Sequence, residues 1–194
     1  YDIQGQVFGT GAATQVKAQA LALPHVVDFA ASNAAACALK KDGTLWCVGD
    51  ANMPGVGNNA PWTQVALSGT PALASIHAGN AGFAALATNG DLHGFGYSLG
   101  FGGPFQDGPK LVDTGVAQVL SGMAASVFLK DAQPDTMFGN LGWEVPNYNE
   151  ATPVGAPFEI AGGNPGWDST VLLAKDGTAW GIGHTHYHIA THVA

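Results

Sequence analysis

Arginine is absent from this chain of 194 residues, and charge of either sign is scarce. The six basic residues are all lysines, charged residues make up 10% of the chain, and the formal net charge is −8. Nucleic-acid binding depends on clustered Lys and Arg side chains that neutralise phosphates, so the composition argues against a nucleic-acid partner. The same shortage of basic residues argues against binding to an anionic membrane surface.

Long apolar runs and catalytic signatures are missing as well. No stretch is long enough and apolar enough to cross a bilayer, so we expect no membrane insertion. The sequence holds no Gly-x-Ser-x-Gly elbow, Cys-x-x-Cys pair, His-Glu-x-x-His helix or phosphate-binding glycine loop. We therefore expect a protein that is not an enzyme and requires no cofactor. The chain begins at Tyr1 without a signal peptide, which indicates a processed mature form or a piece of a longer protein.

Helix-period patterns are scarce, and only residues 12–23, rich in Ala and Gln and followed by Pro24, could form a helix instead of a loop. A different pattern occurs four times: an apolar strand ending in small residues, a second strand, a tight polar turn and a third strand that ends in glycine. The closing glycines are 40 to 47 residues apart, which is the spacing of propeller blades. They are Gly9, Gly49, Gly96, Gly139 and Gly183.

We predict an all-β fold from this period, a β-propeller-like array of about four blades in a single repeat domain. A lone strand over residues 6–9 could close the ring. Three arrangements remain open: a small closed propeller, an open part of a larger ring, or one part of an oligomer that closes the ring. The repeats span 10–49, 50–96, 97–139 and 140–183, and a His-rich tail follows at 184–194.

The hairpin turns carry the strongest local signals. Asp42-Gly43, Asn89-Gly90 and Asp176-Gly177 each predict a tight turn, because these residues tolerate positive φ. The third repeat has residues 131–135 instead, which predicts a longer loop.

Two cysteines, Cys37 and Cys47, flank the first hairpin turn almost symmetrically. They can form a disulfide if the register makes them a non-hydrogen-bonded pair. The alternative is two free thiols buried as small hydrophobic groups. A disulfide would support an exported location.

The hairpins resemble the RCC1-type repeat, best over residues 36–49 and again over 171–183. The first of these segments carries Ala38-Leu39, the Asp-Gly turn, Leu45-Trp46 and a closing glycine. The resemblance covers nearly the whole chain and implies a β-propeller, usually of seven blades, that serves chiefly as a binding scaffold. Functions in the family range from nucleotide exchange on a small GTPase to β-lactamase inhibition by a secreted form; we adopt neither. By alignment the family's turn histidine is replaced by Ala35, Gly82 and Ala125, with Trp167 near the fourth place.

Histidines are concentrated in the C-terminal tail. His184, His186, His188 and His192 share parity, so an extended strand would place them on one face. Imidazole is a common ligand of Zn, Cu and Fe, which makes these residues candidate metal ligands. The alternative is a surface strand or a partly disordered tail. The His-x-His pairs also resemble those near the tips of trimeric phage fibres, which coordinate iron, and imply a receptor-binding tip.

The other histidines fit structural roles better. We expect His77 to be a core or channel residue. His93 takes the position that Trp46 and Trp180 hold in sister repeats, which indicates an aromatic substitute.

Four aromatic residues lie outside the repeated strands, beside prolines, in segments expected to join blades at the ends of the ring. They are Trp62, Trp143, Tyr148 and Trp167. Exposed aromatics on ordered loops serve protein or sugar recognition, although each could instead cover a blade edge.

These observations predict a secreted or surface-displayed binding module, on a cell or a virion. It would recognise a protein or a cell-surface glycan through the four aromatic residues, and it could form a homo-oligomer. The alternative functions are a transition-metal-binding protein or a phage-fibre-like receptor-binding tip that uses the C-terminal histidines. A hydrolase acting on surface polysaccharide is a third class.

Overall fold

The computed structural model describes residues 23–33, 35–49, 62–67, 72–96, 109–132, 134–139, 148–167, 169–183 and 192–193. These residues form sixteen strands in four separate sheets, and the described part of the chain contains no helix that could span a membrane. Each sheet is an antiparallel meander of four strands that follow one another in the sequence. The prediction of an all-β array of about four blades is confirmed.

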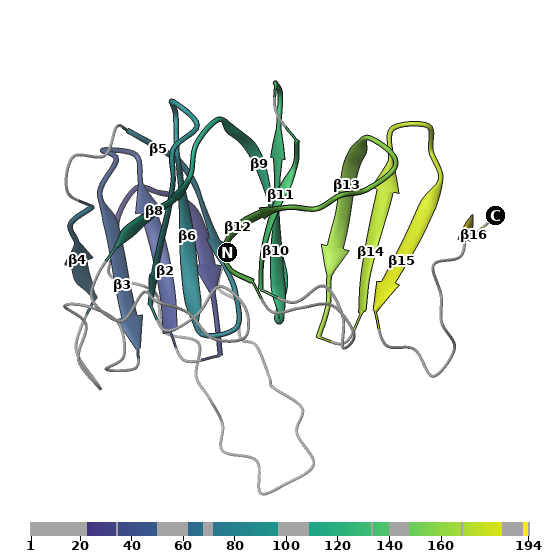
Figure 1. Ribbon diagram of the computed structural model, residues 1–194. Helices are drawn as coiled ribbons and strands as arrows, with labels where there is room; N and C mark the ends of the chain where they lie inside the picture. The colour runs from purple at the N-terminus through teal and green to yellow at the C-terminus, as the bar shows by residue number, and fades with distance from the viewer. Residues whose placement is uncertain are drawn as a thin grey trace, which may run out of the picture.

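The strands of the first two blades are β1 (Val26–Ala31), β2 (Ala35–Lys40), β3 (Leu45–Gly49), β4 (Thr63–Val65), β5 (Leu73–Ala78), β6 (Gly82–Ala87), β7 (Leu92–Gly96) and β8 (Lys110–Asp113). Those of the third and fourth blades are β9 (Val116–Ser121), β10 (Ala125–Lys130), β11 (Thr136–Gly139), β12 (Tyr148–Pro153), β13 (Ile160–Pro165), β14 (Ser169–Ala174), β15 (Ala179–Gly183) and β16 (His192–Val193). Figure 1 shows the four sheets arranged as a fan. The first strand of each blade contacts the first strand of the next, so β1, β5, β9 and β13 form the inner edge of the fan.

The fourth strand of each blade is absent from the pattern read in the sequence. Each sheet takes this strand from beyond the closing glycine, so the predicted repeats differ from the blades in phase. The predicted strand at 6–9 and residues 12–22 of the candidate helix lie outside the described residues.

The hairpins between second and third strands are three-residue loops in three of the blades. In the first blade Lys40 N donates to Thr44 O at 2.9 Å, and Gly43 N donates to Lys40 O at 2.9 Å. Gly43 has φ +80°, whereas Asp42 does not have positive φ, so only the glycine needs the left-handed conformation. The third blade has the longer loop that its sequence predicts, between β10 and β11.

Three hydrophobic cores fill the spaces between successive blades. The first packs Cys37 and Leu39 against residues of the second blade that include Ile76 and Phe83. The second lies between the second and third blades, and the third between the third and fourth. No single blade could bury its apolar faces alone, so the stacking of like sheets supplies the core.

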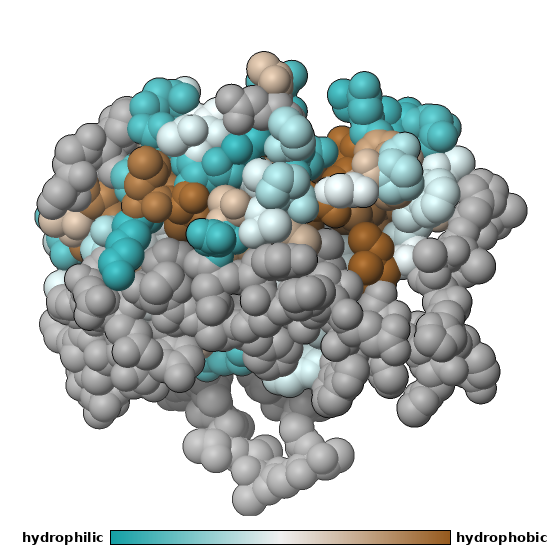
Figure 2. All heavy atoms as spheres, in the orientation of Figure 1, coloured by the Kyte–Doolittle hydropathy of each residue, from teal (hydrophilic) through white to brown (hydrophobic). Residues whose placement is uncertain are grey.

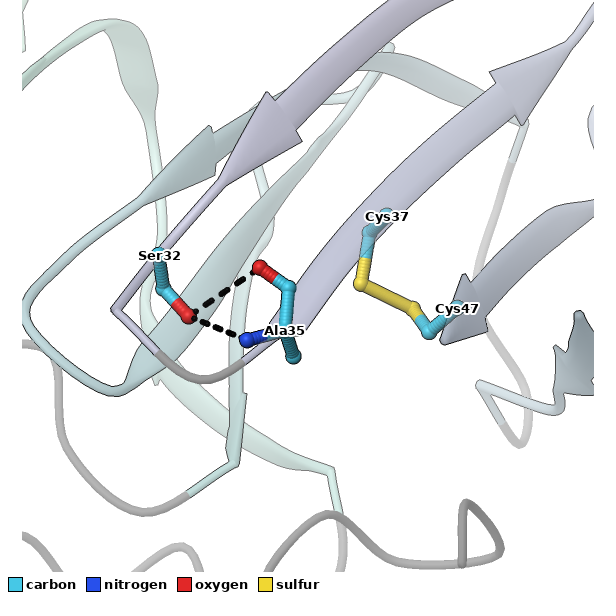
Figure 3. Close-up of a disulfide and its surroundings, with 4 residues drawn as sticks. All are labelled: Ser32, Ala35, Cys37 and Cys47. Atoms are coloured by element: carbon cyan, nitrogen blue, oxygen red, sulfur yellow. Dashed lines mark hydrogen bonds between the residues drawn. A yellow bond between two sulfur atoms is a disulfide. The ribbon is translucent and has the colours of Figure 1, made fainter. Parts of the chain in front are cut away.

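A disulfide joins Cys37 to Cys47, which face each other on β2 and β3 (Figure 3). The Cα atoms are 4.1 Å apart, close to the spacing of a non-hydrogen-bonded pair. The predicted disulfide is confirmed, and the alternative of two free thiols is wrong. Both residues are fully buried in the first core.

Candidate binding surface

The two ends of the fan carry different connections. At one end lie the turns between first and second strands, which contain Asn33, Asn80, Met123 and Trp167; we call it the turn end, the lower end in Figure 1. At the other end lie the hairpins between second and third strands and the described parts of the connections between blades, 66–67 and 72, 114–115 and 154–159. We call it the hairpin end. In Figure 2 hydrophilic side chains gather along the upper edge, over the hairpin end.

The four turns at the turn end share one backbone hydrogen bond. In each turn, the residue just before Asn33, Asn80, Met123 or Trp167 donates its backbone N–H to a carbonyl oxygen across the turn, at 2.8 to 2.9 Å. The pairs are Ser32 N to Ala35 O, Gly79 N to Gly82 O, Gly122 N to Ala125 O and Gly166 N to Ser169 O. The repeated backbone therefore presents one variable side chain per blade at equivalent places.

The first two blades present a polar pair at this end. Asn33 N donates to Asn80 O at 3.0 Å, and Asn33 Nδ2 donates to Asn80 Oδ1. The first turn is also held by Ser32, whose Oγ accepts from Ala35 N at 3.2 Å (Figure 3). These contacts bind the first and second blades together at their tips.

The third and fourth blades present an apolar pair instead. Met123 is 39% exposed and Trp167 is 48% exposed, in turns joined by a hydrogen bond from Ala124 N to Gly166 O at 3.2 Å. Gly122 lies so close to the fourth blade that a Cβ on it would be 1.7 Å from the carbonyl oxygen of Pro165. The backbones that carry Met123 and Trp167 are therefore in direct contact.

The predicted aromatic site is only partly within the described residues. Trp62 is half-buried and directly precedes β4, also at the turn end. Trp143 lies outside the described residues, and of Tyr148 only the backbone is described. Tyr148 begins β12, so its predicted place outside the repeated strands is wrong.

The predicted place of these aromatics between blades is wrong too. Trp62 lies between the third and fourth strands of one blade, and Trp167 lies between β13 and β14 of another. Sequence reasoning missed Met123, although it occupies the same place in its turn as Trp167. Alignment of the four turns could have found it.

The predicted metal ligands cannot be assembled from the described residues. His184, His186 and His188 lie outside them, and of His192 only the backbone is described, paired with Trp180. Within the described ranges no group of three or more His, Cys, Asp or Glu residues could hold a metal ion. The metal site stays a prediction.

Two other histidines have structural surroundings. His77 Nε2 lies 2.8 Å from Ser75 Oγ, and burial lowers the pKa of His77 although Asp28 opposes the shift. His93 stands opposite Ala85, as Trp46 stands opposite Ala38, so the expected aromatic substitution is in register. Burial also lowers the pKa of His93. Both rings are therefore neutral near pH 7.

At the hairpin end a cleft of about 830 Å³ lies between the third and fourth blades. Its walls include Lys130, Asp135, Phe158, Glu159 and Lys175. One ion pair lies there, with Lys175 Nζ 3.0 Å from Glu159 Oε2, and the Asp135 carboxylate accepts a hydrogen bond from the backbone N–H of Lys130 at 2.9 Å. Charged side chains of both signs therefore line this groove.

Asp113 closes the neighbouring junction, between the second and third blades. Its Oδ1 lies 2.6 Å from Lys130 Nζ, and its Oδ2 accepts from Thr136 Oγ1. Burial alone would raise the pKa of Asp113, but the hydrogen bonds from Lys130, Thr136 and Thr114 N outweigh it and lower the pKa. The carboxylate is therefore charged at neutral pH and links the two blades.

No family model and no curated protein matches the chain. Many solved structures are similar to it in fold, among them the following three. Human WBSCR16 superposes with a TM-score of 0.66 at 14% identity, over 93% of this chain and 54% of that one. Prp20p from Saccharomyces cerevisiae, described with its binding to Gsp1p and histones, gives a TM-score of 0.64 at 16% identity, over 80% of this chain and 43% of that one.

Yeast RCC1 (Prp20) bound to Kap60 gives a TM-score of 0.64 at 17% identity, over 80% of this chain and 43% of that one. The chain thus spans about half the length of the solved structures it matches. None of the three supports the resemblance of the tail to phage fibre tips. What they share with this chain is the fold, an RCC1-like β-propeller of which the chain supplies four blades.

Proposed function

We propose that this chain is a protein-binding module whose contact surface is the turn end of the third and fourth blades. Met123 and Trp167 are its apolar contacts. The observation that carries the proposal is that these two large side chains are exposed in equivalent, directly joined turns. Large apolar side chains on rigid turns at the surface are typical of interaction sites.

The residue types fit a protein partner. Trp and Met are enriched at protein interfaces, and tryptophan is among the residues that most often dominate binding energy. The turn backbones are fixed before binding, so little conformational entropy is lost when a partner is bound. The Asn33–Asn80 pair lies at the same end and would form part of a polar rim.

The similar structures support this class of function. Prp20p is described with its binding to Gsp1p and histones, and yeast RCC1 (Prp20) is bound to Kap60. Protein binding is therefore known on this fold. The identity of 14% to 17% carries none of those partners over to this chain.

We also propose that the module is not an enzyme and that it is exported or displayed on a surface. The disulfide supports the location, because such bonds persist in oxidising compartments. A glycan partner is the competing form of the proposal, since tryptophan also packs on sugars.

Selection of peptides from a random display library on the immobilised protein tests the proposal. We expect the selected peptides to bind Trp167→Ala about 30-fold more weakly, the effect of losing roughly 2 kcal/mol at a hot spot. Met123→Ala should weaken them less. Leu111→Ala is the matched control, since Leu111 is 56% exposed on β8 of the second blade.

Two results would contradict the proposal. One is a library that gives no binder. The other is a set of binders equally tight for wild type and Trp167→Ala. Binding on a glycan array that is lost in Trp167→Ala would assign the surface to sugar recognition instead.

A further inference from the structure

The strand register makes the four blades comparable residue by residue. In each blade, one residue of the first strand stands opposite the centre of the second strand. From the first blade to the fourth, these residues are Phe29, Ile76, Val119 and Gly163. The corresponding centres of the second strands are Ala38, Ala85, Phe128 and Leu172. The residues on either side of each centre point to the opposite face of the sheet.

These flanking residues form what we call the forward face, the face turned toward the next blade. In the first three blades they are buried in the core shared with that next blade. They are Cys37 and Leu39, Ala84 and Leu86, and Val127 and Leu129, none more than 8% exposed. In the fourth blade the same two positions hold Val171 and Leu173, which are 52% and 44% exposed.

The opposite, backward face shows the same contrast at the other end of the array. Ile76 and Val119 are buried in the cores that the second and third blades share with the preceding blade. The equivalent residue of the first blade, Phe29, is 76% exposed, and Val27 on the same strand is 60% exposed. Within the described ranges, no blade therefore covers the backward face of the first blade.

Each interior junction joins one forward face to one backward face. Among the described residues the array has three such junctions and one exposed face of each kind, both apolar. A repeat array that ends in solvent normally has polar outer faces on its terminal repeats, and these two blades do not. The two exposed faces are thus complementary halves of a fourth junction.

We propose that the forward face of one copy of this chain packs on the backward face of a second copy. A second, reciprocal contact then closes the pair into a ring with two-fold symmetry. The chain spans 54% of the length of human WBSCR16, so two copies supply about one ring. Eight blades lie within the range of four to eight found in β-propellers. Each junction joins two unlike faces, and the two-fold axis relates the two junctions, so the ring closes when both have formed.

The mass of the chain in solution tests the proposal. Light scattering or sedimentation of the disulfide-bonded chain should give twice 19.7 kDa, with dissociation on dilution. A measured mass of 19.7 kDa at every concentration up to the solubility limit would overturn the proposal. Open polymers of increasing mass would overturn the closed pair.

Substitutions on the two faces separate this contact from other association. Phe29→Asp places a charge on the backward face of the first blade, and the double variant Val171→Asp/Leu173→Asp places two charges on the forward face of the fourth. Each should be monomeric and keep the wild-type circular dichroism spectrum, because the altered side chains are exposed in the single chain. The matched control Leu111→Asp, an exposed apolar residue on neither face, should remain a pair.

Mixing the two monomeric variants gives the sharpest result. The first retains a forward face and the second a backward face, so the mixture should form a heterodimer through one intact junction. Either variant that still self-associates like wild type would overturn the proposal, as would a mixture that stays monomeric.

Discussion

Lys40 in the first blade and Lys130 in the third end the second strand of their blades at equivalent positions, but their charges are used differently. Lys40 Nζ lies 3.3 Å from Asp42 Oδ2, within its own hairpin, and 5.6 Å from the centre of the Trp46 ring. Lys130 Nζ lies 2.6 Å from Asp113 Oδ1, across the junction with the second blade. The repeat therefore fixes where the ammonium group is placed, but not which blade it stabilises.

The preceding blade explains the difference, because the described residues place no blade before the first one, whereas the second blade precedes the third. Only Thr114 and Gly115 join the second blade to the third, so Asp113 ends β8 beside Lys130. Six residues join the third blade to the fourth, and a cleft of about 830 Å³ is present there. Contacts across a junction hold blades to each other, whereas contacts within a hairpin stabilise only a turn.

The largest effect expected from this comparison is that of Lys130→Met. The change leaves the carboxylate of Asp113, 11% exposed, without its cation, which should cost about 3–5 kcal/mol of unfolding free energy. Lys40→Met is the matched control, because its partner Asp42 is 56% exposed and an exposed ion pair contributes little to stability. Urea unfolding monitored by fluorescence measures both. Equal losses in the two variants would contradict the contrast.

The same contrast should hold for apolar contacts. Leu129 packs across the junction with the fourth blade, whereas Leu173 holds the equivalent position with no blade beyond it. Leu129→Ala should cost about 2–5 kcal/mol. Leu173→Ala should cost about 0.5 kcal/mol. Both are best measured with Phe29→Asp present, so that pairing with a second copy does not contribute, and similar costs would contradict the prediction.

Gly122→Ala tests the junction at the turn end. The added methyl group would meet the carbonyl of Pro165, so we expect a loss of about 1–3 kcal/mol as the turns of the third and fourth blades separate. Gly162→Ala is the control, since a Cβ there has no atom within 4 Å. Thermal unfolding compares them. A Gly122→Ala variant as stable as Gly162→Ala would show that the turns are not in close contact.

The sequence alone predicts the first three strands of each blade. The second and third strands pair with each other across a short turn, so their alternation, their turn residues and the cysteine pair can be read locally. The fourth strands were not predicted. β4 and β16 are only three and two residues long, so too few residues are present to show a strand pattern.

The missed fourth strands also explain why Trp62 and Tyr148 were expected in connections between blades. Residues after each closing glycine were interpreted as links between blades, but the chain first adds a strand to its own sheet and crosses to the next blade afterwards. The exposure of Met123 and of the two terminal faces depends on which blades are neighbours in space. A local pattern cannot show that, because Val127 and Val171 have the same place in their strands.

The smallest expected effect concerns Asp42 within the first hairpin. A hydrogen bond from Thr44 Oγ1 at 2.6 Å, and then one from Thr44 N at 3.0 Å, lower the pKa of Asp42 from 3.8 to about 2. The charged form is the one stabilised by folding, so this contribution is complete above about pH 4 and is lost as the pH falls toward 2.

Thr44→Val removes the first bond and should raise the pKa of Asp42 toward 3.8, whereas Lys40→Met should raise it less because Lys40 is a weaker cause. A carbon-detected NMR titration of the carboxyl group measures both shifts. A larger pKa shift in Lys40→Met than in Thr44→Val would contradict the prediction. It would mean that Lys40 stabilises the Asp42 carboxylate more than Thr44 does, so that both Lys40 and Lys130 would be main stabilisers of their carboxylate partners.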